Sequence, residues 1–182
     1  GQGCGTIIGE SGGKLWILTE KKTIKDAAKI KVTFVNDAVA EAKLVRYDGN
    51  TGLAALTVDL EDLETSTQNA ITVMKTAGSN TIHKGSIVIA LGSPLGTNYS
   101  ILTGTITATK NEISTPDNHY SVYTTDIVAS ENGRGVLINM DGELVGVVMQ
   151  SYSAASANTL TAVEISELMP VIDLLFADKE VP

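Results

Sequence analysis

Few side chains in this sequence could serve as a nucleophile or as a base. The chain contains one cysteine, Cys4, and two histidines, His83 and His119. A serine or cysteine nucleophile needs a neighbouring base to take its proton, and that base needs a third group to orient it. Neither histidine belongs to such a pattern, so both are interpreted as loop residues at the surface. Cys4 is interpreted as a small buried residue of a strand.

A serine activated by a lysine is the remaining covalent possibility. Lys22 and Ser130 could form such a pair, because a desolvated lysine can act as a base. No second feature of the sequence supports this pair, so it is the weaker hypothesis. Metal chemistry has no support either, since no cluster of cysteines and histidines has the spacing of metal ligands. We therefore predict no metal and no cofactor.

The stretch with the clearest functional pattern runs from Tyr123 to Gln150. Its second half consists of two apolar runs joined by Asp141-Gly142, which is the strongest short-range signal for a tight β-hairpin. Ahead of the hairpin lies a loop, Ala129–Gly135, that reads ASENGRG and contains two glycines. Thr125-Asp126 precedes this glycine loop. We expect a strand before the loop and the hairpin after it to hold it in place.

The elements that must position the glycine loop are mostly strands. With 182 residues, of which 43% are hydrophobic and 19% charged, the chain can bury a substantial core. Short apolar runs separated by glycine turns, with little helical periodicity, indicate an all-β fold. The predicted strands cover residues 3–9, 15–19, 30–35, 38–47, 53–58, 70–74, 86–91, 101–109, 121–125, 135–140, 144–149 and 159–163. A final helix is predicted from Ile165 to Phe176, with Pro170 in or near its first turn.

The charge of the chain limits its partners. The net charge of -8 argues against nucleic-acid binding, which needs a basic surface. A run of five lysines between Lys21 and Lys31 is interpreted as a solvated face. A single cysteine excludes an intramolecular disulfide framework. No apolar run is long enough to span a membrane and no signal peptide is visible. Because the chain starts at the edge of a strand, we expect a targeting or anchoring segment ahead of Gly1 in the natural protein.

Six segments, taken in order, resemble the trypsin-like serine proteases and most closely their HtrA/DegP-type branch. They are Gly1–Ile8 (GQGCGTII), Ile17–Thr19, Ala42–Val45 with Asp48, Gly85–Gly96 (GSIVIALGSPLG), Gly104–Ile106, and Thr125-Asp126 with the following ENGRG and GELVG. Each segment alone is a weak signal. Together they span almost the whole chain, which makes the resemblance specific.

This resemblance implies an all-β, two-barrel trypsin-like serine protease fold with a C-terminal helix. Each barrel would have six strands, and the active site would lie between the barrels. We expect a single peptidase domain over residues 1–182. Its N-terminal barrel would cover about 1–78, its C-terminal barrel about 79–164 and its helix about 165–176.

The same resemblance implies that the positions of the catalytic triad have lost their residues. Lys22 stands where the family has its histidine, Gly52 where it has its aspartate, and Gly133 where it has its serine. If the gap in the glycine loop is placed after Gly133, Arg134 takes the serine position instead. Glu131 stands two residues before the serine position, where a carboxylate would repel the oxyanion that the family stabilises.

We therefore predict a catalytically inactive pseudoprotease that acts as a protein- or peptide-binding or regulatory module. The alternative is a serine-type endopeptidase-like hydrolase with residual or lysine-assisted activity. The expected binding residues are Glu20, Glu131, Asn132 and Arg134. If Lys22, Glu20, Glu131 and Arg134 pair across the former site, they fill it; if they do not, the site accepts a charged peptide.

A protein or peptide partner is expected, nucleic acid is not expected because of the net charge, and the oligomeric state is left open. The resemblance also implies an extracytoplasmic or cell-surface location, with a membrane tether ahead of this soluble part as a further option.

Overall fold

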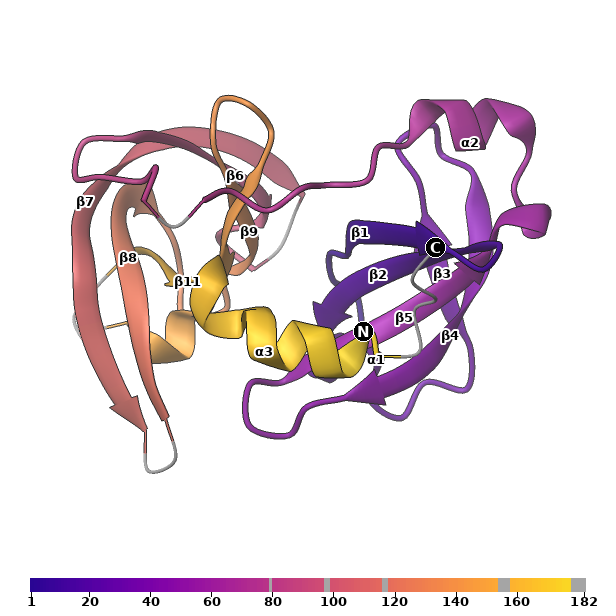
Figure 1. The fold of residues 1–182 in the computed structure, drawn as a ribbon, viewed down its shortest axis with the longest axis horizontal. Coiled ribbons are helices and arrows are strands. Elements are labelled where there is room, and N and C mark those ends of the chain that lie inside the picture. Colours follow the sequence, from indigo (N-terminus) through magenta and orange to yellow (C-terminus); the bar gives the residue numbers. More distant parts are fainter. Residues whose placement is uncertain (79, 97–98, 116–117, 154–157, 178–182) are drawn as a thin grey trace. The chain divides into compact units, whose positions relative to one another are not determined.

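The chain folds into two compact units. The computed structural model describes residues 1–78, 80–96, 99–115, 118–153 and 158–177 (Figure 1). The first unit comprises Gly1–Met74 with Val171–Pro182, and the second comprises Lys75–Pro170. Each unit has its own sheet and its own buried apolar cluster, so the two are described in turn.

The first unit is built on a five-stranded antiparallel sheet with the strand order β1-β2-β5-β4-β3. Its strands are β1 (Thr6–Ser11), β2 (Lys14–Glu20), β3 (Ile30–Thr33), β4 (Val39–Tyr47) and β5 (Leu53–Asp59). Strands β2 and β5 lie at the centre and are almost entirely buried, as expected for apolar runs. This unit also contains three short helical segments: α1 (Lys21–Ile24), η1 (Leu60–Asp62) and α2 (Thr65–Ala70).

The prediction of a six-stranded barrel in this unit is wrong for the described residues. The sixth strand was expected at 70–74, but Ala70 ends helix α2 and residues 71–74 form no ladder. A single backbone hydrogen bond, from the Met74 N–H group to the Ile7 carbonyl at 2.9 Å, ties this segment to β1. Residues 71–74 (ITVM) have the composition of a strand, yet in the structure they form a connection without strand pairing.

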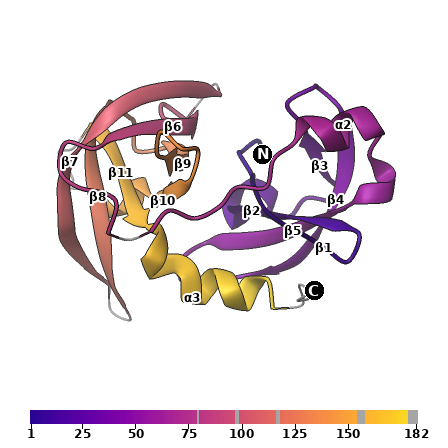
Figure 2. The same cartoon turned by 45° about the horizontal axis from the view of Figure 1, so that its top comes forward.

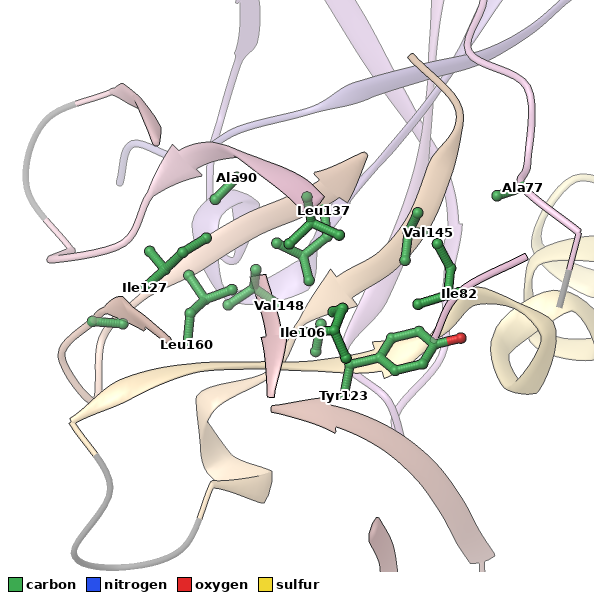
Figure 3. Close-up of a cluster of buried hydrophobic side chains, with 13 residues drawn as sticks. Ala77, Ile82, Ala90, Ile106, Tyr123, Ile127, Leu137, Val145, Val148 and Leu160 are labelled. Atoms are coloured by element: carbon green, nitrogen blue, oxygen red, sulfur yellow. The ribbon is translucent and has the colours of Figure 1, made fainter. Parts of the chain in front are cut away.

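The second unit is a closed six-stranded barrel with the strand order β10-β11-β8-β7-β6-β9. Its strands are β6 (Ile87–Ser93), β7 (Ser100–Thr115), β8 (Asn118–Val128), β9 (Arg134–Ile138), β10 (Leu144–Val148) and β11 (Thr159–Glu164), and η2 (Gln150–Tyr152) follows β10. Figure 2 shows these strands curving around a common interior. That interior is filled by a buried apolar cluster that includes Ile106, Leu137 and Leu160 (Figure 3).

Two features of the second unit bear on the sequence predictions. The hairpin between β9 and β10 turns at Asp141-Gly142, as predicted, and Gly142 has a φ of 76°, which favours glycine. Strands β7 and β8 are much longer than predicted, because they pair with each other as far as Thr115 and Asn118. Backbone pairing sustains this two-stranded ribbon, so its sequence needs no apolar alternation.

Helix α3 (Ile165–Leu175) is the last helix of the described residues. With the sheets of the two units, it confirms the prediction of an all-β fold with a C-terminal helix. Its buried residues Ile165, Leu168, Ile172 and Leu175 follow the predicted apolar face. Pro170 is the sixth residue of the helix, so its position is further from the start than predicted. In the described part of the chain, no helix is both long and apolar enough to cross a membrane.

Candidate functional site

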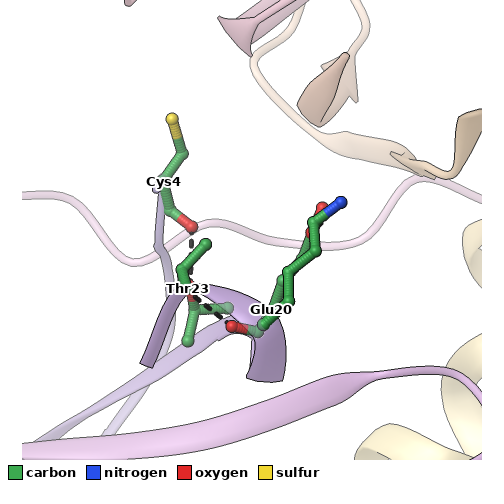
Figure 4. A network of polar contacts seen from close by, with 5 residues as sticks. Cys4, Glu20 and Thr23 are labelled. Atoms are coloured by element: carbon green, nitrogen blue, oxygen red, sulfur yellow. Dashed lines mark hydrogen bonds and ion pairs between the residues drawn. The ribbon is translucent and has the colours of Figure 1, made fainter. Parts of the chain in front are cut away.

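The Lys22 position lies in the short helix α1, directly after the buried strand β2. The Lys22 ammonium group pairs with the Glu20 carboxylate at 3.2 Å, and 60% of the Lys22 side chain is exposed. The Thr23 hydroxyl donates to the Glu20 carbonyl at 2.7 Å, which holds the start of the helix. The Thr19 hydroxyl donates to the Cys4 carbonyl at 2.8 Å, so this corner is tied to the N-terminal segment (Figure 4).

The Gly52 position lies beside α1, in the turn between β4 and β5. The Lys21 N–H group donates to the Gly52 carbonyl at 2.7 Å, so the backbone brings the Lys22 and Gly52 positions together. Gly52 has a φ of 74°, a conformation that residues with a Cβ atom rarely adopt. The Asp48 carboxylate accepts hydrogen bonds from the N–H group and the hydroxyl of Thr51. The turn therefore favours glycine at position 52, although Asp26 and Asp37 show that an aspartate can adopt a similar φ in this chain.

In the second unit, the glycine loop joins β8 to β9 and is fixed by three backbone hydrogen bonds. The Ala129 N–H group donates to the Asn158 carbonyl at 2.8 Å, and the Ser130 N–H group donates to the Pro94 carbonyl at 3.0 Å. The Gly133 N–H group donates to the Ser130 carbonyl at 2.9 Å. The last bond closes a tight turn within the loop. The N–H group at the predicted serine position is therefore already engaged inside the protein.

The surroundings of Gly133 leave no room for a side chain. A Cβ atom built on Gly133 would lie 2.5 Å from the Pro94 carbonyl oxygen, 3.0 Å from the Ser130 carbonyl oxygen and 3.2 Å from Cγ of Gln150. Two of these neighbours are backbone atoms, which cannot move aside as the end of a flexible side chain can. A serine at this position would force the loop to shift.

The predicted binding residues occupy different environments. Glu131 and Asn132 are exposed at the tip of the glycine loop, and Arg134 is half-buried at the start of β9. A Cβ atom on Gly96 would lie 2.8 Å from Cβ of Asn132, so the glycine loop lies directly against the turn after β6. Of the four charged groups expected to pair, Lys22 and Glu20 do so in the first unit. Pairing with Glu131 and Arg134, which belong to the second unit, stays a prediction.

A residue that the sequence reasoning did not select, Gln150, lies at the base of the glycine loop. Only 8% of Gln150 is exposed, and its carboxamide makes three hydrogen bonds. The one signal in the sequence is that a polar residue follows immediately after the apolar run that forms β10. Nothing in its spacing from the glycine loop indicates the contact, because 20 residues separate Gln150 from Ser130.

The closed barrel, the second antiparallel sheet and the C-terminal helix define the class of trypsin-like β folds. A structure of a serine endoprotease from Yersinia pestis aligns with a TM-score of 0.70 and 30% identity, over 96% of this chain and 57% of that one. A structure of the HtrA-type protease AlgW with a decapeptide aligns with a TM-score of 0.70 and 24% identity, over 95% and 51% respectively.

The sequence comparisons identify the family. Residues 3–147 match the family described as the trypsin-like peptidase domain, and the chain belongs to this family. A Marinomonas sp. (strain MWYL1) protein, described as a probable periplasmic serine endoprotease, DegP-like, is 31% identical over 182 residues. That alignment covers 98% of this chain and 36% of the relative, so the chain spans little more than a third of it. The predicted HtrA-type relationship is thereby confirmed.

Proposed function

We propose that this chain is a catalytically inactive HtrA-type domain that binds protein or peptide segments. A trypsin-like fold alone does not specify activity, which depends on the groups placed at its site. Lys22, Gly52 and Gly133 at the three triad positions supply neither a hydroxyl nucleophile nor an imidazole base. Acyl transfer by the family's chemistry needs both.

The observation that carries this proposal is the closed environment of Gly133. Acyl transfer requires backbone N–H groups that are free to stabilise the oxyanion. The Gly133 N–H group donates instead to the Ser130 carbonyl at 2.9 Å. The Pro94 carbonyl occupies the space that a side chain at position 133 would need. The loop therefore withholds both a nucleophile and an oxyanion donor.

The exposed part of the glycine loop supports a binding role. Glu131 and Asn132 lie exposed at its tip, where a carboxylate and a carboxamide are available to a ligand. We propose that these two residues, with Arg134 and Glu20, contact the partner. Glu131 would favour a positively charged group on that partner, because like charges repel and opposite charges attract at short range.

The kind of partner and its location are proposed from the relatives. The AlgW structure contains a decapeptide, so we propose a peptide or an extended protein segment as the partner here. Relatives are described as periplasmic, so we propose an extracytoplasmic location, and we retain a membrane tether as part of that proposal. We further propose that the two units act as one peptidase-like domain, with the five-stranded sheet within about residues 1–78 and the barrel within about residues 79–164.

The alternative, a hydrolase that uses Lys22 as its base, has less support. A lysine acts as a base when burial or a neighbouring positive charge removes its proton. Lys22 is 60% exposed and pairs with the Glu20 carboxylate at 3.2 Å. The side chain is therefore not desolvated, whereas a lysine base of this kind requires desolvation.

Hydrolysis and binding assays on the same peptides test the proposal. We expect no hydrolysis of unfolded casein or of a mixed peptide library, no labelling by a fluorophosphonate probe, and measurable binding of a subset of the peptides. The Lys22→Ala variant tests the alternative, and Lys25→Ala is its control because Lys25 is an exposed lysine of the same segment. Hydrolysis that disappears in Lys22→Ala and persists in Lys25→Ala would overturn the proposal.

A further inference from the structure

Strand β3 forms one open edge of the five-stranded sheet in the first unit, and β1 forms the other. The edge at β1 has a neighbour, because the Met74 N–H group donates to the Ile7 carbonyl at 2.9 Å. No described residue forms a corresponding backbone hydrogen bond to the outer edge of β3. An unpaired edge of this kind can accept a further strand.

The register of β3 shows which main-chain groups face this edge. The Phe34 N–H group donates to the Ala38 carbonyl at 2.8 Å, and the pairing with β4 continues from there without a bulge. Hydrogen-bonded positions alternate along an antiparallel pair, so Val32, like Phe34, directs its N–H and C=O groups to β4. Lys31 and Thr33 therefore direct theirs outward, and both residues are exposed.

The side chains at this edge are basic. Residues 21–31 contain five lysines and one acidic residue, Asp26, so they carry a net charge of +4, whereas the whole chain carries -8. Lys29 directly precedes β3 and Lys31 lies within it, and both are exposed without an ion pair to any described residue. Glu41 lies opposite Lys31 on β4 and offsets part of this charge. Charges are screened over about 8 Å at physiological ionic strength, so a ligand at the edge responds mainly to these nearby groups.

These residues indicate which kind of strand the edge would accept. A second copy of β3 is disfavoured, because lysines would then meet lysines. A strand that carries carboxylates is favoured, since opposite charges on opposed residues stabilise strand pairs. On the other face of β3, Ile30 and Val32 are only partly buried and pack against the apolar cluster of the first unit. The added strand should therefore alternate acidic residues with β-branched apolar residues.

We propose that the edge of β3 is a further binding site, which accepts an extended acidic peptide as an additional strand. The main-chain groups of Lys31 and Thr33 bind the backbone of the peptide. The ammonium groups of Lys29 and Lys31 contact its carboxylates, and its apolar side chains cover Ile30 and Val32. Because this edge belongs to the first unit and the glycine loop to the second, the site is independent of the proposed function.

A short peptide of alternating glutamate and valine, with NMR detection of the amide groups, tests this site. We expect the peptide to slow hydrogen exchange at the Lys31 and Thr33 amides, and a peptide with lysine in place of glutamate to leave this exchange unchanged. Thr33→Pro removes one outward N–H donor and keeps the ladder to β4, so the affinity should fall by about tenfold or more. Thr33→Val keeps the donor and should bind as the parent does.

Charge variants give a second decision, which holds even if Thr33→Pro does not fold. Lys31→Glu should weaken binding of the acidic peptide by about fivefold or more, and Lys84→Glu, the same change at an exposed lysine of the second unit, should not. An affinity within about twofold of the parent in folded Thr33→Pro or Lys31→Glu overturns the proposal.

Two further outcomes would also overturn the site at β3. Protection of the same amides that rises with protein concentration, without peptide, would show that two copies pair there. Peptide-induced changes at the glycine loop alone would contradict a site at β3 and leave the proposed function standing.

Discussion

The carbonyl oxygen of Pro94 lies 2.5 Å from the point that a Cβ atom on Gly133 would occupy. The same carbonyl accepts a hydrogen bond from the Ser130 N–H group at 3.0 Å, so it is held in place by the loop that it blocks. Glycine at position 133 is thus a requirement of the local packing. The closed conformation of the loop and a serine side chain at position 133 therefore exclude each other.

Replacing Gly133 by serine should therefore destabilise the second unit without creating a hydrolase. Overpacking against backbone atoms typically costs about 1–3 kcal/mol of the free energy of unfolding. Gly49→Ser is the matched control, because a Cβ atom on Gly49 meets nothing within 4 Å. Urea unfolding and labelling by a fluorophosphonate probe measure both effects. A Gly133→Ser variant as stable as the parent would show that the loop opens readily.

Asp126 should make the free energy of unfolding of the barrel fall as the pH is lowered. The N–H group of Thr105 donates to the Asp126 carboxylate at 2.7 Å and the Thr105 hydroxyl at 3.0 Å, and these bonds hold the pKa of Asp126 below its usual range. A lowered pKa in the folded state means stabilisation that is present above the unfolded pKa of about 3.9 and is lost as pH falls through the folded value.

At pH values above the unfolded pKa, the parent should therefore have a larger free energy of unfolding than Asp126→Asn. This difference in free energy should become smaller as the pH is lowered. Unfolding by urea over a series of pH values measures it, and NMR titration of the carboxyl group gives the pKa. Thr105→Val should raise the pKa of Asp126 part of the way, because it removes the hydroxyl donor and keeps the N–H donor. An equal pH dependence in the parent and Asp126→Asn would contradict this account.

The pKa of Tyr123 should lie above the usual value for a tyrosine. Burial raises the pKa of its phenol above the usual value, and the neighbouring Glu164 carboxylate adds to this through its charge and its hydrogen bond. A raised folded pKa means stabilisation that is complete below the unfolded pKa of about 10 and is lost as pH rises through the folded value.

Tyr123→Phe should remove the late step from the tyrosinate absorbance titration. In this variant, the free energy of unfolding should also lose the part of its decrease at alkaline pH that is due to the Tyr123 phenol. Glu164→Gln should bring the pKa of Tyr123 closer to the usual value, because the charge is removed while burial remains. If Tyr123 ionises at the usual pH of a tyrosine while the protein is folded, the prediction is wrong.

Phe176 should stabilise the first unit through Trp16. The two rings meet edge to face with centroids 5.6 Å apart, and both residues are buried. Phe176→Ala should lower the free energy of unfolding by about 3–5 kcal/mol. Trp16 is the one tryptophan of the sequence, so its fluorescence reports directly on this contact.

Leu174→Ala is the control for this change. Leu174 lies two residues away and is 71% exposed, so its truncation should change the free energy of unfolding by less than about 0.5 kcal/mol. Urea unfolding followed by tryptophan emission compares the two variants. Equal effects of the two truncations would show that the Trp16–Phe176 contact adds little.

Local sequence patterns were sufficient to place most of the strands and the tight hairpin. The hairpin at Asp141-Gly142 was predictable because its two turn residues specify the geometry within four or five residues. The buried strands β2 and β5 were predictable because their apolar runs are short and end in turn residues. The glycine loop could also be located, although the assignment of Lys22, Gly52 and Gly133 to the triad positions stays a prediction.

Local patterns failed where contacts between distant residues decide the structure. The apolar segment at 71–74 has the composition of a strand, but it joins β1 through a single bond at Ile7. The length of β7 and β8 depends on the pairing of two polar segments, which no apolar periodicity marks.

Gln150 illustrates the same limit at the candidate site. Its role depends on hydrogen bonds to Ser130, Thr159 and Thr161, which the closure of the barrel brings around one carboxamide. The sequence by itself determined the periodicity of the strands, the turns and the position of the glycine loop, because these depend on neighbouring residues. Only the tertiary structure decided that Gly133 is enclosed, because the Pro94 carbonyl and the Gln150 side chain that surround it come from segments far from it along the chain.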